Sequence, residues 1–305
     1  MKRTLQKQLS RLTLPDYIFF AGVCVAIVSL LAFYFVDLRN VFGLRDILFA
    51  VNPLYFYTDY VPLFFAHWGR NGGLAEILQY GLLGSSALIM MYCAGSLYAR
   101  RIAQTSKEAR RQTTQLFMFT LLIAVALLLM LMQDAAGIRH TLMGYVQAIA
   151  DEQDQGVFGT LFEMLYFIVL GGIPVYAYIR YGAPLKQLAR AKVYIIIAYV
   201  FYFAAGSLSF AGTAFSKLVS QNVYEIAGDK FYNFALSIGD PGLQSAWAAL
   251  QATHWWYPIA FNLMDHLVEE NLELIAAGAF LAAATSIYIF VNNTNTQNSE
   301  VKPTP

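Results

Sequence analysis

Apolar residues occur along the chain in runs of about 20 positions, separated by shorter polar stretches. An α-helix rises 1.5 Å per residue, so a run of about 20 apolar residues crosses the ~30 Å hydrocarbon core of a bilayer. Because lipid offers no hydrogen-bond partners, such runs cross it as helices that satisfy their own backbone groups. The pattern therefore predicts an all-α, polytopic transmembrane bundle with six spans at about 17–37, 74–98, 114–133, 159–180, 192–212 and 270–291.

A further apolar stretch at 47–66 contains Asn52, Pro53, Asp59 and Pro62, which would leave polar groups unpaired in lipid. The distribution of Lys and Arg decides whether it crosses. With six spans and a cytoplasmic N-terminus, 14 of these residues lie on the cytoplasmic side and six lie outside. If 47–66 also crossed, the counts would become eight inside and twelve outside. Cytoplasmic loops carry the excess of basic residues, so we expect six spans and two cytoplasmic termini.

Two segments between the spans are predicted to lie on the outer face of the membrane. Segment 47–66 is rich in Tyr and Phe, which favour the membrane–water interface. In the long segment 213–268, Leu243, Trp247 and Leu250 recur at helical spacing. We expect interfacial helices in both places.

Composition supports a membrane class and excludes others. Of the 305 residues, 58% are apolar and 13% are charged, whereas about a quarter of a soluble domain is charged. The net charge of +1 gives no electrostatic support to a nucleic-acid partner. We expect residues 1–291 to form one domain in a bacterial cytoplasmic membrane, with the lipid bilayer as its partner and 292–305 as a disordered cytoplasmic tail.

Acidic residues mark the outer ends of the spans. On the predicted topology, 16 of the 19 Asp and Glu residues fall on the outer side or at the outer ends of spans. Spans two, three, four and six could thus direct carboxylates into one outer vestibule. Its candidate residues are Glu76, Asp134, Glu163, Asp265, Glu269, Glu270 and Glu273.

The last group of acids also suggests a metal site. On a regular helix, Asp265, Glu269 and Glu273 share one stripe, and His266 and Glu270 form the next. Carboxylate and imidazole together suit Zn²⁺, Mn²⁺ or Fe²⁺, and carboxylates alone suit Ca²⁺ or Mg²⁺. A divalent cation held by His266, Glu269, Glu270 and Glu273 is therefore the one cofactor that the pattern indicates.

Arg139 and His140 are candidates for the opposite chemistry. Arg139 is the only basic residue of its predicted outer loop apart from the neighbouring His140. Its guanidinium could pair with Asp134 or bind an anionic lipid headgroup.

An alternative explains the acids as helix caps. Glu76, Glu163 and the acids after 268 lie near predicted helix N-termini, where a negative charge gains about 0.3–1 kcal/mol. Against this, Glu76 and Glu163 have apolar neighbours on both sides. A carboxylate in the bilayer centre costs about 2.5–3.5 kcal/mol, so it usually has a partner or a function.

Several classes of membrane protein are excluded. No Lys lies in the middle of a span to carry a retinal Schiff base, and the nearest, Lys192, lies at a span edge. No His lies deep in a span for a haem between helices. The pair Glu269 and Glu270 resembles the start of the CAAX-type intramembrane protease motif, but the Arg expected after it is absent.

Four short stretches together resemble a loose group of uncharacterised bacterial multi-pass membrane proteins. They are NGGLAE at 71–76, Asp134, the acidic stretch 151–156 and EENLEL at 269–274. In that group the end of the third span is more acidic than here, where Ala135 follows Asp134. The resemblance implies a helical membrane fold and no particular activity.

These observations leave three hypotheses of function. The first is cation- or proton-linked binding and transport of a small solute through the acidic vestibule. The second is a structural or assembly subunit whose outer loops dock a membrane protein partner. The third is a metal-dependent enzyme acting on a lipid or lipid-linked substrate, with the acids and His266 as its chemistry.

Overall fold

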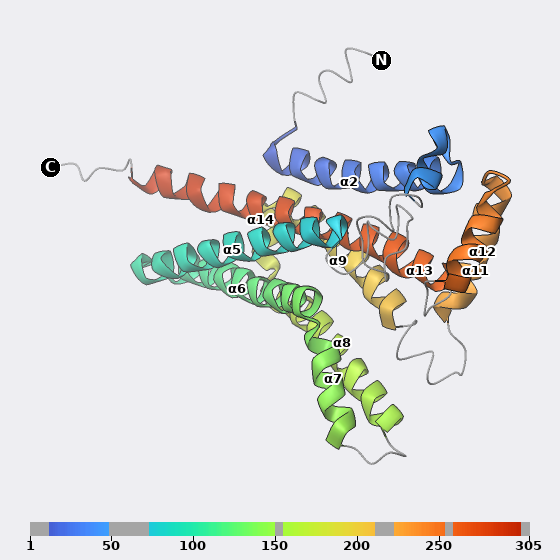
Figure 1. Cartoon of the computed structure of the whole chain (residues 1–305). Helices are drawn as coiled ribbons and strands as arrows, with labels where there is room; N and C mark the ends of the chain where they lie inside the picture. Colours follow the sequence, from blue (N-terminus) through green and yellow to red (C-terminus); the bar gives the residue numbers. More distant parts are fainter. Residues whose placement is uncertain (1–11, 49–72, 150–154, 211–222, 254–258, 300–305) are drawn as a thin grey trace, which may run out of the picture.

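The computed structural model describes residues 12–48, 73–149, 155–210, 223–253 and 259–299, and all regular structure in these ranges is helical (Figure 1). Six helices are long and apolar enough to cross a membrane, which confirms the predicted all-α multi-pass fold. They span Leu14–Leu38, Leu74–Ala103, Lys107–Ala136, Phe158–Tyr181, Ala189–Phe210 and Ile259–Asn293.

Helices of different types follow one another along the chain. The first span combines α2 (Leu14–Ala32) with a π-helical turn, η1 (Phe33–Leu38). The next elements are α5 (Leu74–Ala103), α6 (Lys107–Ala136), α7 (Ile138–Ile149), α8 (Gln155–Tyr181) and α9 (Ala189–Phe210). The final part contains α11 (Val223–Ile238), α12 (Leu243–Thr253), α13 (Ile259–Asn262), the π-helical η5 (Leu263–Glu269) and α14 (Glu270–Ser299). Short 3₁₀ turns lie at Val41–Gly43 (η2) and Ala183–Gln187 (η3).

The last span is the centre of the bundle. In its most apolar stretch 67% of the residues are buried, against 22% in the first span. Its small side chains allow α2, α5 and α9 to approach closely. A Cβ placed on Gly22 of α2 would lie 3.5 Å from the Cα of Gly278, while Asn271 donates to Ser29 about two turns further along. The buried alanines are Ala276, Ala277, Ala279, Ala282, Ala283 and Ala284.

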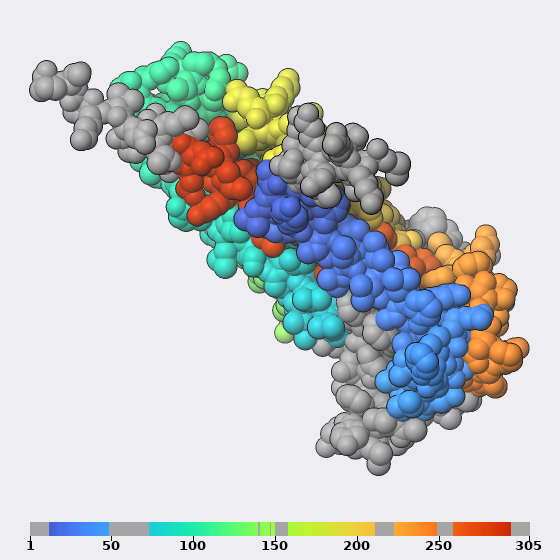
Figure 2. All heavy atoms as spheres, turned by 90° about the horizontal axis from the view of Figure 1, so that it is seen from above, coloured from blue at the N-terminus to red at the C-terminus, as the bar shows by residue number. Residues whose placement is uncertain are grey.

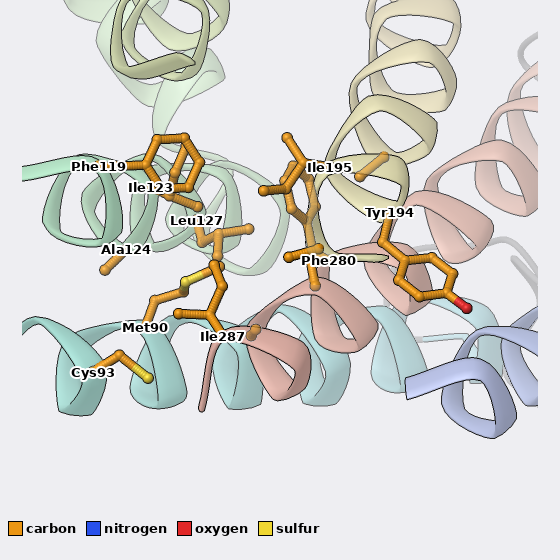
Figure 3. Close-up of a cluster of buried hydrophobic side chains, with 14 of the residues drawn as sticks. Met90, Cys93, Phe119, Ile123, Ala124, Leu127, Tyr194, Ile195, Phe280 and Ile287 are labelled. Atoms are coloured by element: carbon orange, nitrogen blue, oxygen red, sulfur yellow. The ribbon is translucent and has the colours of Figure 1, made fainter. Parts of the chain in front are cut away.

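A hydrophobic core fills one half of the bundle. Met90 of α5, Phe119 and Leu127 of α6, and Phe280 and Ile287 of α14 interdigitate there (Figure 3). On α5 this core begins with Leu83, one turn after the polar Gln79. The other half of the bundle, where α5 begins and α6 ends, therefore lies outside the packed core.

A smaller apolar cluster covers the end of the first span. Leu243 and Trp247 of α12 are fully buried and pack with Phe33 and Leu38 of η1. Figure 2 shows this η1–η2 region in light blue against the orange α11 and α12. The predicted helix at Leu243 and Trp247 is thus present, and its apolar face packs on protein. The other predicted interfacial segment, 47–66, lies almost wholly outside the described residues.

The structure changes both ends of the sixth predicted span. The helix begins at Ile259 rather than at 270, because Asn262, Asp265 and His266 lower the local hydropathy without ending the helix. At its far end it continues to Ser299, beyond the predicted 291. The acids between 265 and 273 therefore lie well inside a helix.

A partly buried ion pair joins the chain just after η2 to the turn between α11 and α12. The Arg45 side chain is 2% exposed, and its Nη1 and Nη2 donate to the two carboxylate oxygens of Asp240 at 2.6 and 3.2 Å. Arg45 Nη1 also donates to the backbone carbonyl oxygen of Asp37 at 3.0 Å. These hydrogen bonds, led by those from Arg45, hold the pKa of the Asp240 carboxyl below its usual range.

We predict that Asp240→Asn destabilises the protein by about 1.5–3 kcal/mol at neutral pH, because it removes a charged hydrogen-bond partner of a buried guanidinium. Folding lowers the Asp240 pKa, so its contribution is complete above the unfolded value of about 3.9. The contribution is lost as the pH falls through the lower folded-state pKa. Thermal unfolding of the purified protein at several pH values measures the difference.

The matched control is Asp46→Asn. The Asp46 side chain is 69% exposed, and its Oδ1 lies 3.8 Å from Arg45 Nε. Its loss should change stability little, because exposed ion pairs contribute about 0–1 kcal/mol. Equal effects of the two substitutions would contradict the role given to Asp240.

Candidate functional site

A cavity of about 1610 Å³ occupies the half of the bundle that the core leaves open. Helices α5, α6, α8, α9, η5 and α14 all contribute to its wall. Arg139 and His266 are the basic residues among the described lining. The carboxylates in the wall are Glu76, Asp134, Asp265, Glu269, Glu270 and Glu273. The structure therefore brings six of the seven predicted vestibule acids into one space.

Gln79 joins two of these acids from different helices. Its Nε2 donates to Asp134 Oδ2 of α6 at 2.9 Å and to Glu273 Oε2 of α14 at 2.7 Å. The Tyr202 hydroxyl oxygen of α9 lies 3.2 Å from the same nitrogen. Gln79 is fully buried. One amide group thus connects four helices at the boundary between the core and the cavity.

This arrangement sets the charge state of the pair. Two ionised carboxylates that share one donor repel each other strongly where little water screens them. An amide NH₂ group supplies hydrogen bonds but no positive charge. The geometry at Asp134 and Glu273 therefore favours a shared proton or a bound cation.

Glu269 is fixed by neighbours outside its own helix. The Tyr224 hydroxyl of α11 donates to Glu269 Oε2, and the Ser209 side chain of α9 also hydrogen bonds to this carboxylate. The residue is 9% exposed. Glu269 is thus held in place on the cavity wall.

Two acceptor atoms in the wall lack a hydrogen-bond donor. Gln79 Oε1 and Glu270 Oε2 are both buried, and neither has a hydrogen-bond partner among the described residues. A buried acceptor without a donor costs about 1–3 kcal/mol. The two atoms therefore mark where a ligand or water could donate hydrogen bonds.

The π-helical turn η5 affects which way the acidic side chains between 265 and 273 point. A π-turn bonds each carbonyl to the fifth residue ahead, which shifts the register of side chains beyond it. The two stripes expected on a regular helix consequently merge. Asp265, His266, Glu269, Glu270 and Glu273 all line the cavity.

Arg139 has an acidic partner other than the one predicted. Its Nη1 lies 3.5 Å from Glu163 Oε1, and these side chains are only 7% and 1% exposed. The guanidinium also lies over the Phe167 ring, 5.0 Å from its centroid. Glu163 therefore pairs with a buried Arg and is not among the residues that line the cavity, while Arg139 also interacts electrostatically with Asp134.

The backbone places Arg139 against α8. Gly137 ends α6 with a φ of 55°, a left-handed conformation that glycine adopts without strain. The chain then turns directly into α7, which leaves the bundle beside α8 (Figure 1). Arg139 is the second residue of α7 and so reaches Glu163 at the turn.

The positions of the acids argue against solvated caps. Glu76 does lie in the first turn of α5, but it is 7% exposed. Glu163 lies eight residues after the first residue of α8, Gln155. The acids from 265 to 273 follow the helix start at Ile259.

The predicted metal ligands are not assembled as such. Among the described residues, no group of three or more His, Cys, Asp or Glu side chains is placed to hold a metal ion. His266 Nδ1 instead lies 3.6 Å from Asp265 Oδ2. The set of His266, Glu269, Glu270 and Glu273 thus gives no support to a divalent cofactor. The side chain of His140 lies outside the described residues.

Sequence reasoning missed several residues of this site. Gln79 lies three residues after Glu76, so both fall on one helix face, and this spacing could have revealed it. Tyr224 lies 45 residues before Glu269, and no local pattern connects them.

No protein-family model, curated protein or solved structure matches this chain. The resemblance of four short stretches to bacterial membrane proteins therefore stays a prediction. The cavity and its side chains are what bears on function.

We predict that Arg139→Met and Glu163→Met each lower the free energy of unfolding by about 3–5 kcal/mol, because each leaves a buried charge without its ion-pair partner. The double variant should be less destabilised than the two single effects added together, because no charge is then stranded. Thermal unfolding of all three variants completes the double-mutant cycle.

Arg190→Met is the control for losing a guanidinium. The Arg190 side chain is 52% exposed and its Nη2 lies 3.9 Å from Asp16 Oδ2, so the expected loss is about 0–1 kcal/mol. Additive effects at Arg139 and Glu163 would show that the two side chains do not act as a pair.

Proposed function

We propose that this chain is a multi-pass membrane protein that binds a small cationic solute in its acidic cavity and moves it across the membrane in exchange for protons. The observation that carries the proposal is the hydrogen bonding of Gln79 Nε2 to both Asp134 and Glu273. Two carboxylates that accept from one uncharged donor support the sharing of one proton or one cation between them.

The charges of the wall support a cationic solute. Six carboxylates line the cavity, and the one Arg among the described lining residues is already paired with Glu163. Charges act over longer distances in a low-dielectric cavity than in water. A cation is attracted to such a site, and an anion is repelled.

Competition at the same carboxylates supports coupling to protons. A proton on the pair of Asp134 and Glu273 lowers its charge and so weakens cation binding. A bound cation favours release of that proton, because the two effects are reciprocal. Exchange of one for the other needs no second site.

For orientation, we propose that both termini face the cytoplasm and that the cavity lies towards the outer face. Basic residues support this: Arg100 and Arg101 end α5, and Lys107 begins α6, at the end of the bundle opposite the cavity. A bacterial cytoplasmic membrane and interfacial positions for α11 and α12 belong to the same proposal.

We predict that proteoliposomes on a solid-supported membrane give transient currents when the pH, ammonium or guanidinium concentration is jumped. Asp134→Asn and Glu273→Gln should each reduce these currents at least about tenfold, because the amide cannot exchange a proton or hold a cation. Both substitutions keep the size of the side chain.

Glu108→Gln is the control, because Glu108 is exposed in the first turn of α6 at the far end of the bundle. Its currents should match those of the wild type. Folded, inserted wild-type protein that gives no current in any of the three jumps would overturn the proposal.

A further inference from the structure

The cavity opens sideways between α8 and α9. Four of its lining residues are strongly exposed: Ile168 and Val175 of α8 at 65% and 51%, and Val200 and Phe203 of α9 at 59% and 78%. Exposure this high places them at the rim of the cavity rather than in its inner wall. All four are apolar.

The rim lies at mid-span. Ile168 to Val175 occupy the middle of the span Phe158–Tyr181, and Val200 to Phe203 occupy the middle of Ala189–Phe210. At this depth the surroundings of a transmembrane helix are hydrocarbon. The opening therefore faces lipid rather than water.

Glycines keep the space between the two helices open. Gly171 and Gly172 of α8 and Gly206 of α9 line the cavity, and apart from the adjacent backbone of the same helix no described atom lies within 4 Å of a Cβ placed on any of them. We call the opening bounded by these glycines and the four rim residues the α8–α9 slot.

Two contacts between α8 and α9 close the ends of the slot. On one side, the Tyr199 hydroxyl donates to the backbone carbonyl oxygen of Pro174 at 3.1 Å. On the other, the rings of Phe167 and Phe210 meet edge to face with centroids 6.2 Å apart. Phe167 and Pro174 are seven positions apart, which corresponds to about 10 Å along the helix and is wide enough for a hydrocarbon group.

The inner end of the cavity has the opposite chemistry. Within the part of the chain that the structure describes, Gln79 Oε1 and Glu270 Oε2 are buried acceptors without donors, and Gln79 is itself fully buried. Both residues line the cavity, as do the carboxylates around them. A ligand that satisfies this end brings N–H donors together with a positive charge.

We infer that the solute is an amphipathic primary amine, whose ammonium group binds at Gln79 and Glu270 and whose apolar body lies in the α8–α9 slot. This inference rests on the proposed function and specifies its substrate class. The cavity of about 1610 Å³ exceeds the 300–1,000 Å³ typical of sites for drug-sized ligands, so both parts fit. The amine can then enter the cavity from the bilayer, because the rim is apolar and faces lipid.

Calorimetry of the full-length protein in phosphatidylcholine nanodiscs tests the inference, with empty nanodiscs as the blank. The probe is 2-phenylethylammonium. It should bind at least about tenfold more tightly than propylammonium, which lacks the apolar ring, and than trimethyl(2-phenylethyl)ammonium, which lacks N–H donors. Neutral 2-phenylethanol should show no binding.

The variant Gly172→Leu distinguishes the contribution of the α8–α9 slot to binding from that of the carboxylates. The added side chain fills the slot, so binding of 2-phenylethylammonium should weaken at least about tenfold, while propylammonium binds as in the wild type. Gly95→Leu is the matched control, because Gly95 is an exposed helical glycine of α5 that also has no atom within 4 Å of its Cβ position.

Each remaining outcome has one meaning. Equal affinity for the phenyl and propyl amines, or equal weakening of both by Gly172→Leu, would overturn the amphipathic substrate. If the currents of the preceding section persist in that case, the proton-linked cation site stands and only the substrate class is wrong. If those currents are absent too, both proposals fail.

Discussion

The hydrogen bonds of the Gln79 amide nitrogen join α5, α6 and α14 at the level where the packed core ends. Carboxylates in an apolar bundle are tolerated only where other groups satisfy them. Gln79 supplies donors to Asp134 and Glu273 but cannot neutralise them. The proposed binding of a proton or a cation at this pair rests on that arrangement.

The two halves of the bundle differ because their helices pack differently. Buried alanines on α14 bring neighbouring helices close in the core half. In the other half, the turn at Gly137 and the ion pair between Arg139 and Glu163 hold α8 beside α7. Glycines then leave space between α8 and α9. The cavity is thus a consequence of helix geometry as well as of polar residues.

Much of the fold could be predicted from the sequence, because a span is a property of about 20 consecutive residues. The start of the last span was missed because hydropathy counts Asp265 and His266 as exposed to lipid, whereas they face the cavity. The positions of acidic residues at the ends of the spans predicted six of the acids that line the cavity, but they did not predict which residues these acids contact. The predicted metal set assumed a regular helix where η5 is a π-turn, and among the described residues no group of three or more such side chains is placed to hold a metal ion.

Contacts between distant parts of the chain set the limit of such prediction. Glu163 lies 24 residues after Arg139, and Tyr224 lies 45 residues before Glu269. Both pairs depend on how helices meet, which no local spacing encodes. Gln79 is the exception, since it shares a helix face with Glu76.

The slot and the carboxylates lie in different parts of the cavity, which suits the two chemically different ends of the proposed amphipathic cation. Carrying a free ammonium group into hydrocarbon is costly, whereas its apolar body gains nothing by leaving lipid. The opening lies at mid-span between α8 and α9, and the carboxylates lie at the inner end of the cavity. The apolar body of the proposed amine can therefore remain in an apolar setting while its ammonium group meets the carboxylates. In the proposed exchange, protonation of Asp134 and Glu273 lowers the negative charge beside Gln79 and favours release of the cation. In this arrangement the pair controls only the charged group, so coupling to protons does not require the slot to change shape.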